Sequence, residues 1–137
     1  MLVAAPAMAQ VEVKDPWMRA PVHQQSSAGA FMRLTAAKAT RIVQLSSPVA
    51  GLAEIHEMKL VDNVMRMRPV TVLELPAGQT IELKPGGYHV MLFELKQPLK
   101  EGDEVPLTLV AEGRDGKRTN VEVKVPVKAL TAMPGKH

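Results

Sequence analysis

Short runs in which apolar and polar residues alternate are the main pattern of this chain, and they predict β-strands. In residues 11–14, Val-Glu-Val-Lys alternates at every position, which sends successive side chains to opposite faces of an extended backbone. Turn-forming residues separate the runs, as at Pro76-Ala77-Gly78 and Asp115-Gly116. We expect about eight or nine strands from eleven such runs, several of which are only four residues long. The runs are residues 11–14, 17–20, 28–35, 39–45, 52–58, 65–68, 71–75, 80–83, 88–95, 105–111 and 119–125.

Short strands separated by so many turns predict an all-β fold, a β-sandwich. The run Tyr88 to Leu95 is almost continuously apolar and predicts a central strand that is covered on both faces. Asp15-Pro16 is expected to break the first strand, because proline cannot donate a hydrogen bond to a neighbouring strand. A short helix near residues 128–132 is the one helical segment that the pattern allows.

Size and composition indicate a single soluble domain without a membrane span. The chain has 137 residues, of which 46% are hydrophobic, and no apolar run is long enough to cross a bilayer. Its net charge is only +3 and the basic residues are scattered. With one Trp, one Tyr and two Phe it also offers few surfaces on which bases could stack. Nucleic-acid binding is therefore disfavoured.

The absence of cysteine excludes several kinds of chemistry. No disulfide, thiolate nucleophile, Cys-ligated zinc or iron–sulfur site can form, and a blue-copper electron-transfer centre also requires a Cys thiolate. His56-Glu57 does not begin an HExxH zinc motif, because Leu60 stands where the second histidine would be. There is no Gly-rich phosphate loop either.

Residues 1–9 resemble the end of a secretory signal peptide. Ala7-Met8-Ala9 matches the small-x-small cleavage pattern, which would leave Gln10 as the mature N-terminus. The alternative interpretation is an Ala-rich N-terminus that carries no targeting signal. We expect an exported protein, with a signal remnant at 1–9, a binding domain at 10–127 and a flexible tail at 128–137.

Three pairs of histidine and methionine residues are the candidate chemistry of the chain. The two members of each pair are two positions apart, so on a strand both leave the same face. The pairs are His56 with Met58, Met65 with Met67, and His89 with Met91. Imidazole nitrogen and thioether sulfur together make a soft site that favours Cu(I). Taken singly, each methionine is more often core filling and each histidine more often structural.

The spacing of these residues resembles a known motif. His56, ten residues, Met67, twenty-one residues and then His89-Val90-Met91 match the H(M)x10Mx21HxM pattern of the periplasmic copper chaperone family PCu(A)C. The resemblance extends from Val11 to Val127. It also includes Asp15-Pro16-Trp17 with Arg19, Met65-Arg66-Met67, Leu75-Pro76-Ala77-Gly78, Pro85-Gly86-Gly87-Tyr88 and Pro98-Leu99.

The resemblance implies a cupredoxin-like (Ig-like, Greek-key) β-sandwich that binds Cu(I). By resemblance the Cu(I) ligands are His56, Met67, His89 and Met91. Glu57 stands where the motif has its bracketed Met, so the match says nothing firm about Met58. Met58 and Met65 are auxiliary ligands, lining residues or core.

Two imidazoles and two thioethers are all neutral, so such a site would keep the full charge of Cu(I) and would not favour Cu(II). The imidazoles must be deprotonated to bind, so affinity should fall in acid. The family's role implies a periplasmic metallochaperone rather than an enzyme. We also expect a monomer that binds no nucleic acid. Its implied recipient is the binuclear copper centre of cytochrome c oxidase subunit II, or another copper chaperone.

Weaker signals lie outside the motif. His23 is in a polar segment, where a solvated residue is the simpler interpretation, while Met133 and His137 resemble the Met/His-rich tails of some family members. These three residues are candidates for a second, weak Cu(II) site. Lys59, Arg66 and Arg68 could steer an acidic partner, although such residues more often form a solvated face.

Three other functions stay open at this point. The chain could be a copper buffer or resistance protein with the same site and no dedicated recipient. It could be a metal-free Ig-like interaction module whose methionines form an adaptable surface. A copper enzyme or electron carrier is disfavoured by the absence of cysteine or a further open set of ligands.

Overall fold

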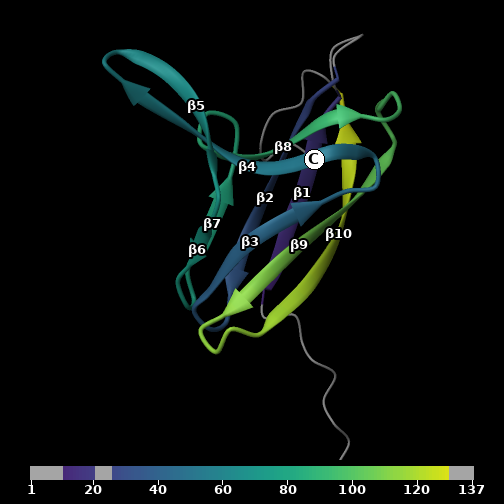
Figure 1. Cartoon of the computed structure of the whole chain (residues 1–137). Coiled ribbons are helices and arrows are strands. Elements are labelled where there is room, and N and C mark those ends of the chain that lie inside the picture. The colour runs from purple at the N-terminus through teal and green to yellow at the C-terminus, as the bar shows by residue number, and fades with distance from the viewer. Residues whose placement is uncertain (1–10, 21–25, 130–137) are drawn as a thin grey trace, which may run out of the picture.

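The structure, a computed structural model, describes residues 11–20 and 26–129, and within these ranges every regular element is a β-strand. The strands are β1 (Val11–Arg19), β2 (Ala28–Ala36), β3 (Thr40–Ser46), β4 (Ala50–Val61), β5 (Val64–Val70), β6 (Leu73–Leu75), β7 (Thr80–Leu83), β8 (Tyr88–Leu95), β9 (Glu104–Gly113) and β10 (Arg118–Lys128) (Figure 1). No helix long and apolar enough to span a membrane occurs in these ranges. The all-β expectation is confirmed.

The strands form a mixed sheet in the order β5-β4-β8-β2-β1-β10-β9-β3-β6, with β7 paired to β2. Every pair is antiparallel except β1 with β10, which run parallel. The sheet curls, so that one part built on β2, β4 and β8 packs against another built on β3, β9 and β10. A single core lies between the two parts.

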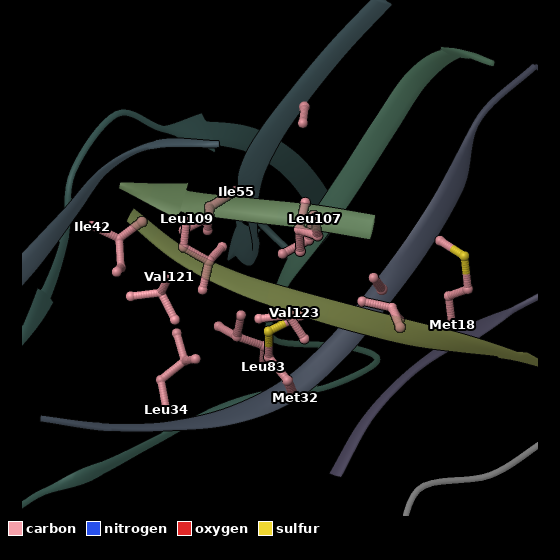
Figure 2. Close-up of a cluster of buried hydrophobic side chains, with 14 of the residues drawn as sticks. Met18, Met32, Leu34, Ile42, Ile55, Leu83, Leu107, Leu109, Val121 and Val123 are labelled. Atoms are coloured by element: carbon pink, nitrogen blue, oxygen red, sulfur yellow. The ribbon is translucent and has the colours of Figure 1, made fainter. Parts of the chain in front are cut away.

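The side chains of alternate strand residues fill that core. Along β9, Val105, Leu107, Leu109 and Ala111 are buried, while the residues between them are half-buried or exposed. Figure 2 shows Leu107 and Leu109 of β9 in the same cluster as side chains from the other strands. That cluster includes Met18, Met32, Leu34, Ile42, Ile55, Leu83, Val121 and Val123. A strand such as β9 therefore has one face that is fixed by the core and one that is available for other roles.

The expectation that Asp15-Pro16 breaks the first strand is wrong, because β1 continues through these two residues. The register with β2 shifts between Lys14 and Trp17, and Asp15 adopts a φ of 52°. This irregularity is a bulge, which leaves residues out of the hydrogen-bonded ladder, so the proline interrupts no pairing. Pro69 is likewise inside β5, which is an edge strand that tolerates a missing donor.

β4 and β5 are longer than the predicted runs at 52–58 and 65–68, and together they form a hairpin. Asp62 and Asn63 have φ values of 51° and 64°, the left-handed backbone of a two-residue hairpin turn. β4 pairs with β8 only as far as Glu57, opposite Tyr88. Residues 58–67 therefore project as a two-stranded ribbon, the β4–β5 arm, which extends away from the rest of the sheet in Figure 1.

β8 has the bounds that the sequence predicted and lies between β4 and β2. The expectation that it is covered on both faces is wrong. Val90 and Leu92 are buried in the core, whereas Met91 and Phe93 on the other face are only half-buried. The half-open face is the one that carries candidate ligands.

The chain end also differs from expectation. Lys128, which we assigned to the tail and to a short helix, is the last residue of β10. Residues 130–132 of that expected helix, the signal remnant at 1–9 and most of the tail lie outside the described residues.

Candidate metal centre

His56 of β4 and His89 of β8 are paired directly across the two strands. Their neighbours Ile55 and Val90 form the adjacent pair and point into the core, so the two imidazoles leave from the outer face. The ring centroids are 6.2 Å apart. Two residues separated by 32 others in the sequence are thus brought together by strand register.

The two candidate methionines lie on the same outer face. Met67 of β5 is opposite Met58 of β4, and its Sδ lies 3.2 Å from Nε2 of His89. Met91 of β8 lies two residues after His89 and is paired with Gly29 of β2. A Cβ placed on Gly29 would be 3.7 Å from Sδ of Met91, so the glycine leaves room beside that thioether. Three strands therefore bring the four motif residues to one face.

His89 is held by its backbone surroundings. Its Nδ1 lies 2.9 Å from the carbonyl oxygen of Gly87, and only 6% of the residue is exposed. A carbonyl oxygen can only accept, so Nδ1 carries the hydrogen and donates it. In the neutral ring Nε2 then keeps a lone pair, and that lone pair faces the Met67 sulfur.

The contact between His89 and Met67 therefore joins two atoms that have no hydrogen to share. A thioether sulfur is only a weak acceptor, so the 3.2 Å separation is not a hydrogen bond between neutral groups. For zinc, nitrogen and sulfur ligands at ~2.0 Å and ~2.3 Å and a tetrahedral angle are about 3.5 Å apart. The pair is thus placed much as two ligands of one soft cation would be.

His56 has a carboxylate neighbour that the sequence reasoning missed. Oε1 of Glu54 lies 3.1 Å from Nε2 of His56. The expectation of an entirely neutral site is therefore incomplete, because a carboxylate lies beside one imidazole. Its signal was present in the sequence: Glu54 is two residues before His56 and so shares its strand face.

Aromatic rings line the rest of this face. The Phe93 ring centroid is 5.4 Å from that of His56, and the Phe31 centroid is 6.4 Å from that of His89. Phe31 also contacts Trp17, with centroids 4.7 Å apart, and the guanidinium of Arg19 lies over both rings. These side chains limit access of water to the two imidazoles from that side.

Met58 and Met65, the auxiliary candidates, lie along the β4–β5 arm. Met58 is half-buried and pairs with Met67, whereas Met65 is exposed and pairs with Leu60 farther out. Met58 is therefore next to the candidate ligands, and Met65 is one step away from them.

The basic residues lie on the opposite face of the β4–β5 hairpin. Arg68 pairs with Glu57 at 3.0 Å, and this hydrogen bond lowers the pKa of the Glu57 carboxyl. Burial, and then a hydrogen bond with Glu57, raise the pKa of Tyr88. Lys59 and Arg66 are directly opposite each other, and neither forms an ion pair in the described part of the chain. Two like charges face each other there, next to the site but not within it.

Other candidate positions contribute no described geometry. His23, Met133 and His137, the candidates for a second site, lie outside the described residues. Within residues 11–20 and 26–129, His, Asp and Glu side chains form no group of three or more that could hold a metal. A cavity of about 340 Å³ lies elsewhere, lined by Arg41, Glu74, Glu112 and their neighbours, and it contains neither His nor Met.

A family model and curated relatives match most of this chain. Residues 11–127 match the family described as "Putative lipoprotein LpqE-like". The "Putative lipoprotein Lxx21020" of Leifsonia xyli subsp. xyli is 30% identical over 119 residues, which cover 86% of this chain and 69% of that protein.

Solved structures share the fold. The apo PCuAC domain from PmoF1 is 26% identical with a TM-score of 0.71, covering 88% of this chain and 95% of that domain. The Cu(I) form of DR1885 from Deinococcus radiodurans is 31% identical with a TM-score of 0.61, covering 89% of this chain and 83% of that protein. The resemblance to PCuAC domains and their β-fold, expected from the motif, is confirmed.

Proposed function

Because this chain belongs to the LpqE-like family and has the fold of PCuAC domains, we propose that it is a Cu(I)-binding metallochaperone. The observation that carries the proposal is the 3.2 Å contact between Sδ of Met67 and Nε2 of His89, two atoms with lone pairs and no hydrogen between them. The Cu(I) form of DR1885 supports the same metal in a protein of similar sequence and fold. Copper is the cargo of this protein, and no reaction is catalysed.

The proposed ligands are His56, Met67, His89 and Met91. Two imidazoles and two thioethers suit the soft Cu(I) ion, and none of the four adds a negative charge of its own that would favour Cu(II). We assign the binding domain to residues 10–127, which correspond closely to the family match at 11–127.

Exposure differs among the ligands in a way that suits transfer. Met67 is 48% exposed on the β4–β5 arm, whereas His89 is 6% exposed. An acceptor that approaches the arm would reach the Met67 sulfur first and could replace the neutral ligands one at a time. The acceptor that we propose is the copper centre of cytochrome c oxidase subunit II or another copper chaperone. We place this transfer in the periplasm, with the protein as a monomer. The family's description as a lipoprotein supports export.

Met67→Ala is expected to weaken Cu(I) binding, because it removes one of four ligands from a site that remains folded. Leu60→Ala is the matched control, since Leu60 is an exposed apolar residue on the same face of the arm and carries no ligand atom. Anaerobic competition with a chromophoric Cu(I) chelator should give one copper per unmodified chain. We expect the Cu(I) affinity of Met67→Ala to be at least about tenfold lower. A tenfold loss is the smallest that usually follows from mutating a residue that only supports a metal ligand.

The same titration can refute the proposal. Unmodified protein that binds no copper above background, or equal affinities of the Met67 and Leu60 variants, would contradict it. The methionines would then be the adaptable surface of an interaction module. Transfer of the bound copper to an apo acceptor would separate a chaperone from a buffer.

A further inference from the structure

Glu54 and His56 are neighbours on the outer face of β4. Because alternate residues of a strand share a face, the carboxylate of Glu54 reaches the imidazole two residues later. Oε1 of Glu54 lies 3.1 Å from Nε2 of His56, and their side chains are 37% and 12% exposed. The contact is therefore partly shielded from water, where a charge-assisted hydrogen bond is stronger than at a fully exposed site.

This contact determines which nitrogen of His56 carries the hydrogen. An ionised carboxylate only accepts hydrogen bonds, so Nε2 of His56 must be the donor. In the neutral imidazole the other nitrogen, Nδ1, then has a lone pair. That Nδ1 atom is buried and has no hydrogen-bond partner among the described residues. A buried acceptor without a partner is costly, about 1–3 kcal/mol in general, and therefore requires an explanation.

His89 shows the complementary arrangement. Its Nδ1 donates to the carbonyl of Gly87 at 2.9 Å, which leaves Nε2 with the lone pair that faces Met67. The two paired imidazoles are thus held in opposite tautomers, one by a carboxylate and one by a backbone carbonyl. Metal-binding histidines usually donate their second ring N–H to such an acceptor, which orients the ring and makes it a stronger ligand.

We propose that Glu54 is a positioning residue for copper binding, which fixes the tautomer of His56 so that Nδ1 is the ligating atom. This inference rests on the proposed function and adds to it an atomic assignment: His56 binds through Nδ1 and His89 through Nε2. Glu54 is also paired across the strands with Met91, so its negative charge lies beside the site. It offsets the charge of the bound Cu(I) without being a ligand.

The test compares four proteins: the unmodified chain, Glu54→Ala, Glu54→Gln and Glu57→Ala. Glu57 is the matched control, because it lies on the same strand but faces Arg68 on the opposite side. Long-range nitrogen–proton NMR spectra of the copper-free proteins report the tautomer of each imidazole. Anaerobic chelator competition reports the Cu(I) affinity, and circular dichroism verifies the fold.

We expect the unmodified protein and Glu57→Ala to hold His56 with hydrogen on Nε2. Glu54→Ala should lose that preference and bind Cu(I) about 10–100-fold more weakly, the usual effect of removing a group that supports a metal ligand. Glu54→Gln should retain part of the tautomer preference and part of the Cu(I) affinity, since its amide oxygen can accept the same hydrogen bond. On adding Cu(I), the nitrogen signals of Nδ1 in His56 and Nε2 in His89 should shift most.

Each contrary result has a distinct meaning. An unchanged tautomer and affinity in Glu54→Ala, or a copper-induced shift on Nε2 of His56, would overturn the positioning role. Failure of the unmodified protein to bind Cu(I) would overturn the proposed function instead. The copper-free spectra would still decide whether Glu54 sets the tautomer.

Discussion

His89→Ala is expected to abolish tight Cu(I) binding while leaving the fold intact. His89 is the candidate ligand with most contacts to the others: it is paired with His56, its Nε2 touches the Met67 sulfur, and Met91 is two residues away on its strand face. Truncation of His89 removes one candidate ligand and also the group that the Met67 sulfur contacts. The affinity should therefore fall by more than about 100-fold, beyond the range for residues that only support ligands.

The control for this prediction is His23→Ala, which removes an imidazole outside the motif. Chelator competition should show the tight site unchanged in that variant. Equal losses in both variants would mean that histidines contribute only nonspecifically. A His89→Ala protein that retains full affinity would remove His89 from the ligand set.

Leu92→Ala is expected to cause a large loss of stability, because Leu92 is 1% exposed on the core face of β8. Truncating a buried leucine removes its burial and leaves a cavity, which together cost about 2–5 kcal/mol. That is a large part of the roughly 5–15 kcal/mol that stabilises a typical domain. Denaturant unfolding followed by circular dichroism measures it.

Leu52→Ala is the matched control for Leu92→Ala, since Leu52 lies on the neighbouring strand β4 and is 44% exposed. It should cost less than about 1 kcal/mol, as surface substitutions usually do. Folded Leu92→Ala should still bind one Cu(I), because its side chain points away from the candidate ligands. Similar costs for the two leucines would contradict the placement of β8 inside the sheet.

Local patterns predicted the positions of the strands better than the lengths of the strands. The apolar run 88–95 coincides with β8, and the spacing of His89 and Met91 placed them on one face, because alternation along a strand is a local property. The β4–β5 arm was underestimated, since its outer residues pack on no core and hydrophobic alternation does not mark such a ribbon. Asp15-Pro16 was misjudged because a bulge removes the penalty that proline would otherwise carry.

The pairing of His56 with His89 could not be obtained from local pattern at all. It depends on the register of β4 against β8, which is set by burial of Ile55, Val90 and their neighbours in the core. The family motif supplied the candidate residues, but not the atoms of those residues that would face a metal ion. Glu54 has no place in the motif, because a carboxylate is not a soft ligand. Only its position two residues before His56, on the same strand face, indicates the contact.

We propose that two imidazoles and two thioethers surround one copper ion. X-ray absorption at the copper edge, on the anaerobic protein loaded with one Cu(I), tests it most directly. About two nitrogen and two sulfur neighbours are expected around the copper, with loss of one sulfur in Met67→Ala. A shell of only nitrogen and oxygen, or an unchanged sulfur count in that variant, would contradict it.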